Sequence, residues 1–349
     1  MYCYPYSSEW MSGLLGDPEV EELFDAATML MHMLRMEAAV ARIQASLGMI
    51  SPSSAEEIAT AIRGFEQDDQ RLERSVARDG MVVPGLARQV RQALSEQAGR
   101  EFHLGLTSQD LIDTAMAMAV ARFVPLLKQR LARLDRSLER FDAACGSVTV
   151  DGYTRMQAAK PIALNHRIGV WRTLLAEHGT LVGDSGDKAA KLQLAGPVGT
   201  GEELGEFAPE IRRKLAQTLS LALDDSSWQT NRAALASFAS ACSSLACAIA
   251  KIGKDLALMA QLGDVGFKGG GTSSAMPHKS NPIGAETMIA IGHFAALLLP
   301  GMHYALMHEQ ERSGSMWTLE WMIFPQICVA TGKSILTAEK TVSSVLLKR

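Results

Sequence analysis

The chain has 349 residues, of which 47% are hydrophobic and 21% charged, and its formal net charge is −4. This length is enough for one large core or two to three domains, and the composition is that of a soluble globular protein. The small negative charge excludes the basic surplus expected of a nucleic-acid-binding protein. Five cysteines without CxxC spacing favour a reducing compartment over disulfides or a metal site.

The first ten residues, MYCYPYSSEW, contain neither a basic segment nor an apolar segment of the kind found in signal peptides. We therefore expect a cytoplasmic protein without a signal peptide. Residues 233–250 carry no charge and approach the length of a membrane span, but they are mostly Ala and Ser. We interpret them as a soluble helix that is packed closely on all sides, and we expect no membrane partner.

Hydrophobic periodicity indicates a chain that is nearly all α-helix. Apolar residues recur at spacings of three and four from Ala26 to Met49, and the sequence SPSSAEE at 51–57 is typical of a break followed by a capped helix start. No segment shows sustained alternation of apolar and polar residues. Further helices are expected over 109–141, 156–182, 207–223, 229–262, 283–299 and 316–345, the last after a break at Pro300 and the sequence RSGS.

Helices of about thirty residues exceed the average of about 11–12 and are typical of the shaft of a helix bundle. The sequence predicts an N-terminal helical domain over 1–102 and a central long-helix bundle over 103–345. The Ala-, Ser- and Cys-rich helix at 229–262 is expected to pack against further copies of the chain, because its small side chains cannot build a thick core within one subunit.

Four polar segments lie at the ends of these helices: FHLGLTSQD (102–110), DGYTRMQAAKP (151–161), GGGTSSAMPHKSNP (269–282) and HEQERSGSMW (308–317). Each has an ordinary interpretation when taken alone. TSQD is a good helix cap, the serine-rich segment is a plausible surface loop, and Arg155 and His103 could satisfy local partners. Their joint occurrence at helix ends, where anions bind well, points instead to a binding site for carboxylates or phosphates.

The segment GTSSAMPHKSNPIGAE resembles the signature loop of the fumarase/aspartase superfamily, whose pattern is G-S-S-x-M-P-x-K-x-N. HLGLTSQDLIDTA (103–115) resembles that family's first conserved segment, and DGYTRMQAAKP falls where the second is expected. The resemblance covers essentially the whole chain. It implies an all-α fold of long helices, a homotetramer with a central bundle of helices from all subunits, and active sites that each use segments of three chains. Many members also carry a third, C-terminal domain, which we expect to be absent or much reduced here.

The resemblance also implies roles for the signature loop. The superfamily eliminates or adds a group beta to a carboxylate, through a dianionic intermediate that needs positive groups and N–H donors already in place. Ser273, six residues before Lys279, corresponds to the serine that takes the proton, and Ser274 supports it. Lys279 and Asn281 are expected to hold a carboxylate while the glycine-rich loop closes over the substrate and excludes water.

The second segment departs from the family pattern. Fumarases and adenylosuccinate lyases have a histidine after the threonine, where this chain has Arg155, but the partner glutamate of that histidine is retained as Glu286. An alcohol or amine needs a proton as it leaves, whereas a carboxylate, with a pKa near 4, does not. Lactone chemistry fits this change. The resemblance then narrows to the cycloisomerase branch, which closes 3-carboxy-cis,cis-muconate to 4-carboxymuconolactone in protocatechuate degradation.

Two further segments resemble that branch: GMVVPGLARQVRQAL (80–94) and HEQERSGSMWTLEW (308–321). The segment WQTNRAALASF (228–238) resembles W-H-T-x-R-D, but it lacks the aspartate after Arg232, which weakens any role for that segment.

A tricarboxylate substrate on an acidic protein requires locally concentrated cations, and Arg155, Lys279 and Arg312 are the candidates. Thr107 and Ser108 can add hydroxyl and backbone N–H groups at a helix start. His103 is interpreted as a carboxylate ligand, with proton donor as the alternative. The histidines lack the spacing of metal ligands, so we expect no metal and no cofactor. Two other functions stay open, an adenylosuccinate lyase or related amine or oxygen lyase, and a non-catalytic helical scaffold.

Overall fold

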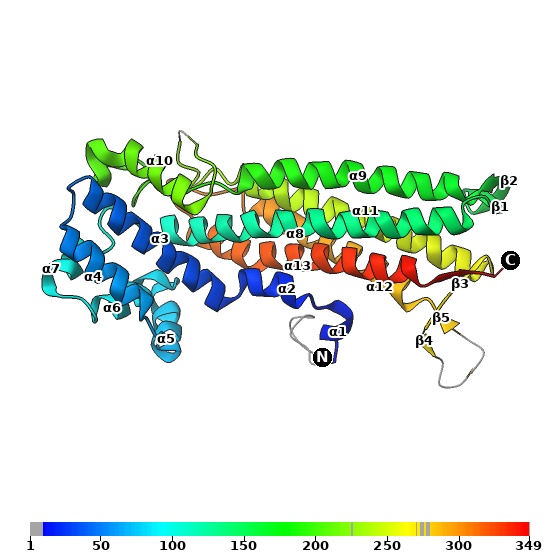
Figure 1. Cartoon of the computed structure of the whole chain (residues 1–349), viewed down its shortest axis with the longest axis horizontal. Helices are drawn as coiled ribbons and strands as arrows, with labels where there is room; N and C mark the ends of the chain where they lie inside the picture. Colours follow the sequence, from blue (N-terminus) through cyan, green and yellow to red (C-terminus); the bar gives the residue numbers. More distant parts are fainter. Residues whose placement is uncertain (1–9, 225, 270, 273–275, 277–279, 349) are drawn as a thin grey trace.

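Long helices run side by side along the whole length of the molecule, as the computed structural model shows (Figure 1). The structure describes residues 10–224, 226–269, 271–272, 276 and 280–348. The bundle consists of α8 (Ser108–Cys145), α9 (Leu164–Ala189), α11 (Ala233–Gln261), α12 (Ile283–Tyr304) and α13 (Gly314–Ser343). The predicted all-α fold of long helices is confirmed.

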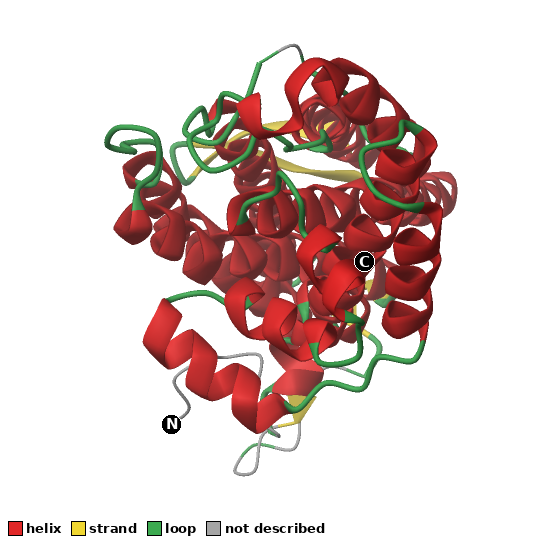
Figure 2. Cartoon of the chain, turned by 90° about the vertical axis from the view of Figure 1, so that its left-hand side faces the viewer, coloured by secondary structure: helices red, strands yellow, loops and turns green. Residues whose placement is uncertain are grey.

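Shorter helices cover one end of this bundle, on the left of Figure 1, and Figure 2 looks at the molecule from that end. They are α3 (Ala26–Ser46), α4 (Pro52–Arg63), α5 (Asp69–Asp79), α6 (Val83–Arg91), α7 (Glu96–Glu101), the 3₁₀ turn η3 (Glu202–Phe207) and α10 (Ala208–Leu219). The short helices α1 (Ser12–Leu15) and α2 (Pro18–Glu21) and the turn η2 (Glu22–Phe24) lie along the bundle.

The apolar interior forms two main clusters. In the bundle, the ring of Phe238 packs against those of Phe123 and Phe324, with centroids 6.2 and 6.1 Å apart. The second cluster lies under the short helices and includes both Ile58 of α4 and Leu111 of α8. It therefore contains residues from both sides of the predicted domain boundary at residue 102. That boundary stays a prediction.

The expected helix over 156–182 is wrong at its start. Residues Thr149–Thr154 and Gln157–Ala163 form the antiparallel strands β1 and β2, and α9 begins only at Leu164. The β-branched and aromatic residues of β1 favour a strand, and Pro161 cannot donate the N–H that a helix interior needs. The hairpin is too short and too irregular for alternation to reveal it, since its register shifts between Asp151 and Tyr153.

Other strands are short: β3 (Val265–Phe267) pairs with β6 (Val345–Leu347), and β4 (Gly271–Thr272) pairs with β5 (Ser280–Asn281). The predicted break at Pro300 is also wrong, because α12 continues through this proline to Tyr304. The remaining helix predictions are confirmed to within a few residues at their ends.

Two helices in the described part of the chain, α11 and α12, are long and apolar enough to cross a membrane, and 61% and 33% of their apolar stretches are buried within the chain. Core helices of soluble proteins can have the same length and composition. Here α11 packs against α9, α12 and α13. A Cβ built on Gly292 would lie 2.5 Å from the Ala250 side chain, so the small residues of α11 bring its backbone close to α12 within a single chain.

Candidate active site segments

The loop before α8 presents His103 on a sharply turned backbone. His103 and Gly105 both have positive φ, 65° and 73°. This backbone conformation is energetically unfavourable for a non-glycine residue such as His103, and such residues are often found at functional sites. The buried Phe102 anchors the loop, and Gln44 Nε2 donates to Leu104 O over 2.8 Å. The ring nitrogen Nδ1 of His103 lies 2.5 Å from Oε1 of buried Glu37, so Nε2 is the nitrogen left for a ligand.

Thr107 precedes α8 and Ser108 is its first residue, as expected of a helix cap. Oδ2 of Asp110 accepts the Thr107 N–H over 3.0 Å, and the two oxygens of Asp110 also accept the backbone N–H groups of Ala195 and Gly196 over 2.9 and 3.1 Å. Burial raises the pKa of Asp110 to about 6, although these N–H donors act against the shift. The carboxylate therefore fixes the segment around residue 195 against the start of α8.

Arg312 lies over this helix start and contacts only neutral acceptors. Its Nε donates to Gln109 Oε1 over 3.0 Å, and its Nη2 donates to Thr107 Oγ1 and Pro197 O over 3.0 and 2.9 Å. No carboxylate of the described residues lies within ion-pair distance of it. Burial lowers the pKa of Arg312, with the more distant Asp110 opposing the shift. A half-buried guanidinium without an acid partner among the described residues is suited to a substrate carboxylate.

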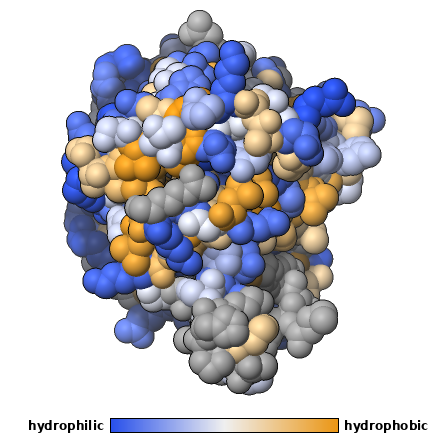
Figure 3. Space-filling model, turned by 90° about the vertical axis from the view of Figure 1, so that its right-hand side faces the viewer, coloured by the Kyte–Doolittle hydropathy of each residue, from blue (hydrophilic) through white to orange (hydrophobic). Residues whose placement is uncertain are grey.

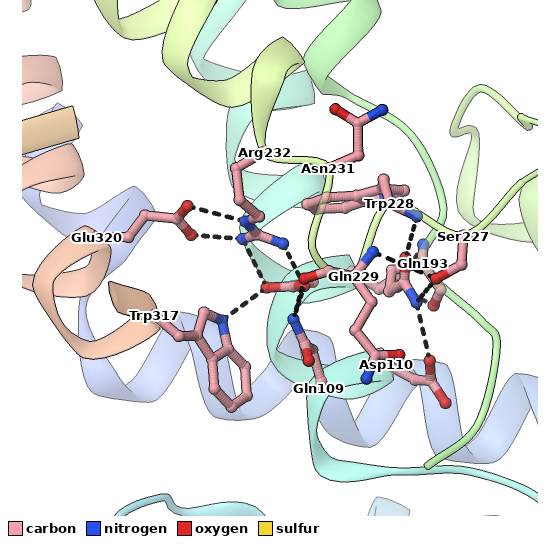
Figure 4. A network of polar contacts seen from close by, with 12 residues as sticks. Gln109, Asp110, Gln193, Ser227, Trp228, Gln229, Asn231, Arg232, Trp317 and Glu320 are labelled. Atoms are coloured by element: carbon pink, nitrogen blue, oxygen red, sulfur yellow. Dashed lines mark hydrogen bonds and ion pairs between the residues drawn. The ribbon is translucent and has the colours of Figure 1, made fainter. Parts of the chain in front are cut away.

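A fully buried ion-pair cluster around Arg232 is connected to Arg312 through Gln109 (Figure 4). Arg232 donates to both oxygens of Asp113, over 2.6 and 3.0 Å, and to both oxygens of Glu320, over 2.9 and 2.5 Å. Trp317 Nε1 donates to Asp113 over 3.0 Å, and the Trp228 ring stacks on the guanidinium 4.6 Å away. Burial raises the pKa of Glu320, and the charge of Arg232 opposes this. Arg232 is the cation that both buried carboxylates share, so it holds this cluster together.

At the opposite end of the bundle, Arg155 and Met156 form the two-residue turn of the β1–β2 hairpin. Both have positive φ, 50° and 63°, as a type I′ turn requires. The hairpin, α9 and α11 line a cavity of about 890 Å³ that includes Arg155, Lys160 and His166. Figure 3 looks at this end of the molecule and shows apolar surface between polar patches.

The short strands β4 and β5 also lie toward this end, below the bundle in Figure 1. Asn281 ends β5, beside a cavity of about 400 Å³, and Glu286 is exposed in the first turn of α12. Ser273, Ser274 and Lys279 lie outside the described residues. The structure gives no ion pair between Arg155 and Glu286 in the described part of the chain, so their pairing stays a proposal.

The predicted site residues that the structure describes thus fall into two groups at the two ends of the molecule. Helix α8 has 38 residues, which is about 57 Å at 1.5 Å per residue. His103, Thr107, Ser108 and Arg312 lie at its amino end, whereas Arg155 follows its carboxyl end in the hairpin. One chain therefore does not bring these residues together, and a site that uses both groups must combine ends of different copies.

The structure adds residues that the sequence did not indicate as functional, namely Glu37, Gln109, Asp113 and Glu320. They pair with groups 66 to 203 residues away, which no local pattern reveals. Across the described ranges, His, Cys, Asp and Glu side chains form no group of three or more that could hold a metal ion. Cys145, Cys242, Cys247 and Cys328 are free.

Comparison with known proteins places this arrangement in a family. The family model described as "Lyase" matches residues 19–294, which is most of the chain. The chain belongs to this lyase family. It is 33% identical to the 3-carboxy-cis,cis-muconate cycloisomerase of Pseudomonas aeruginosa over 90% of this chain and 73% of that one. It is 29% identical to the enzyme of the same name from Pseudomonas putida, over 92% and 78%.

A solved structure supports the same family membership. The 3-carboxy-cis,cis-muconate lactonizing enzyme from Pseudomonas putida superimposes on this lyase with a TM-score of 0.91 and 28% identity, over 97% of this chain and 77% of that one. The bundle and the short helices at its end are therefore features that this lyase shares with its relatives.

Proposed function

We propose that this lyase is a cycloisomerase that interconverts 3-carboxy-cis,cis-muconate and 4-carboxymuconolactone, in catabolism of aromatic compounds through the β-ketoadipate pathway. The observation that carries the proposal is the 33% identity, over 90% of the chain, to a relative with this activity in its name. The substitution of Arg155 for the family's histidine supports it, because a leaving carboxylate needs a cation and not a proton donor.

The substrate and the product are isomers as free acids, but one of the three ionised carboxylates becomes the lactone ester, so the lactonising direction takes up one proton from solution. In the lactonising direction, a carboxylate oxygen of the substrate bonds to the carbon beta to a second carboxylate, and the electrons of the double bond move into that second carboxylate. A proton then reaches the alpha carbon, for which we propose Ser273 as the carrier. In reverse, Ser273 takes the alpha proton and the lactone C–O bond breaks, which releases a carboxylate that needs no proton.

The charged groups suit a tricarboxylate. We propose that Arg312, with Thr107 and Ser108, holds one carboxylate at the start of α8, and that His103 contributes its Nε2. Lys279 and Asn281 would bind the carboxylate that takes up the developing charge, where preformed positive groups stabilise the transition state. Arg155, supported by Glu286 of another copy, would bind the carboxylate that becomes the lactone oxygen.

Because these groups lie at opposite ends of one chain, we propose a homotetramer with closed symmetry. Exposed apolar side chains on α12 and α13 support association, since Leu297, Tyr304 and Met322 are 78%, 60% and 56% exposed in the isolated chain. The cytoplasm is the proposed location.

The decisive experiment is to incubate the purified protein with 3-carboxy-cis,cis-muconate and to follow the loss of the conjugated diene absorbance, with NMR to identify the lactone. Adenylosuccinate serves as the competing substrate, with fumarate formation as the readout. Turnover of adenylosuccinate alone would replace the proposal by an amine lyase, and turnover of neither substrate would overturn it.

A further inference from the structure

Arg312 and the buried ion-pair cluster are joined by one side chain, Gln109, which is itself fully buried. Its Nε2 donates to Asp113 Oδ2 over 3.0 Å and to Gln229 O over 2.8 Å, and its Oε1 accepts from Arg312 Nε over 3.0 Å. Both partners of Nε2 are acceptors only, so the amide has only one orientation that satisfies all three hydrogen bonds. The oxygen of Gln109 must face Arg312.

The charges on the two sides of this amide explain its position. Arg232 is shared between Asp113 and Glu320, and these three side chains, each 1% exposed, sum to a charge of −1 when all are ionised. Arg312 brings the balancing positive charge but does not touch either acid. The Gln109 amide accepts a hydrogen bond from Arg312 and donates one to Asp113. The cation and the acid therefore stabilise each other through these two hydrogen bonds without direct contact.

The guanidinium of Arg312 is thereby held by one side only. A guanidinium has five N–H donors. Nε and Nη2 donate to Gln109, Thr107 and Pro197, and the structure shows no hydrogen bond from Nη1 to any residue that it describes. The Nη1 edge is left for an incoming acceptor. A fork-shaped cation that is already oriented loses less freedom on binding a carboxylate than a mobile one.

We propose that Gln109 is a positioning residue, which acts through Arg312 by holding this guanidinium free of acid partners and aimed at a substrate carboxylate. The inference rests on the proposed function, because it takes the ligand of Arg312 to be a carboxylate of the substrate. It also explains why an amide suits this position better than an acid. A glutamate at residue 109 would repel Asp113 and would pair with Arg312, which would then compete with the substrate.

The test is a double-mutant cycle on the kinetics of 3-carboxy-cis,cis-muconate turnover, with Gln109→Met, Arg312→Met and the two combined. If Gln109 acts only through Arg312, Gln109→Met should lower kcat/KM by about 10- to 100-fold in the native background and by less than about 2-fold in the Arg312→Met background. The loss should appear mainly in KM, because the contact with a substrate carboxylate exists before the transition state.

Two further variants separate positioning from folding. Gln193→Met removes another fully buried amide, one that bonds to Asp110, Ser227 and Trp228 but not to Arg312. Its melting temperature shows what the loss of a buried amide costs the fold. Gln109→Glu keeps the shape and should raise KM further than Gln109→Met. Equal losses from Gln109→Met in both backgrounds would overturn the inference while the proposed function stands. A wild-type protein without turnover would overturn the proposed function, and this inference with it.

Discussion

Two arginines at the same end of the bundle illustrate how surroundings decide what a charged residue does. Arg232 donates to two carboxylates and is 1% exposed, and the charges of Asp113 and Glu320 raise its pKa against the opposing effect of burial. Among the residues that the structure describes, Arg312 has only neutral acceptors. A buried cation that is already neutralised maintains structure, whereas a cation without an acid partner can bind an anionic ligand.

Exchanging each arginine for methionine should separate these roles. Arg232→Met leaves two buried acids without a cation, which should cost about 3–5 kcal/mol of stability. Arg312→Met should fold normally and lose about 2–5 kcal/mol of transition-state binding. Urea unfolding and steady-state kinetics on both variants check this. If the Arg312→Met protein had the native kcat/KM, Arg312 would not be part of the substrate-binding site.

Ser273 carries the proposed proton transfer, and replacing it by alanine removes the hydroxyl with little change in volume. Turnover should fall by roughly two to four orders of magnitude, the usual effect of losing a general acid–base group. Substrate binding should survive, which equilibrium dialysis on the inactive variant can measure. Turnover close to wild type would show that another group carries the proton, and His103 is the next candidate.

His32 is a buried titratable group on α3 that is not among the proposed site residues. It is 3% exposed, and neither ring nitrogen has a hydrogen-bond partner in the described structure. Burial, with the charges of Arg122 and Arg35, lowers the pKa of His32 from 6.5 to about 4. His32 therefore takes up a proton less readily in the folded protein than in the unfolded chain. Its contribution to the free energy of unfolding is fully present above about pH 6.5 and is lost as the pH falls toward 4.

Thermal unfolding from pH 7.5 to 4 should therefore show a decline that His32→Leu reduces, because leucine cannot take up a proton. Other acids titrate over the lower part of this range, so the difference between the two proteins is the informative quantity. Identical pH profiles for both proteins would show that His32 contributes nothing to acid sensitivity.

At the level of elements, the long helices could be predicted because the apolar residues of each recur with the 3.6-residue period of an α-helix. The β1–β2 hairpin could not, since it has few residues per strand and its turn, Arg155-Met156, contains none of the Asn-Gly or Gly-Gly pairs that usually mark a type I′ turn. The family motifs indicated His103, Thr107 and Arg312 as candidate site residues. They did not reveal Glu37, which lies 66 residues from its partner.

The hairpin turn itself predicts a stabilising substitution. Met156 has a φ of 63° and is 76% exposed, so its side chain gains little from packing in the isolated chain and its backbone is strained. Met156→Gly should relieve this conformation and stabilise the protein by roughly 1 kcal/mol. The melting temperature of Met156→Gly measures the effect, with Met307→Gly as a comparison, because Met307 is also exposed but does not have a positive φ. A lower melting temperature would indicate that Met156 is packed against another copy.

At the scale of the whole molecule, the length of α8 separates the site residues, because it puts His103 and Arg312 at one end and Arg155 at the other. Local sequence contains no information about which ends meet in an assembly, so this part of the site rests on geometry and on the family. A mixture of two inactive variants can test it directly.

His103→Ala and Arg155→Met, each inactive alone, should regain activity when they are unfolded together and refolded as mixed assemblies. If each site takes its two ends from different chains, about one quarter of the sites in an equal random mixture will have both native residues. The matched control is the mixture of His103→Ala with Arg312→Met. These two residues lie at the same end of one chain, so every site in that mixture has one defect and no activity should return. Recovery in both mixtures, or in neither, would contradict a site shared between the opposite ends of different copies.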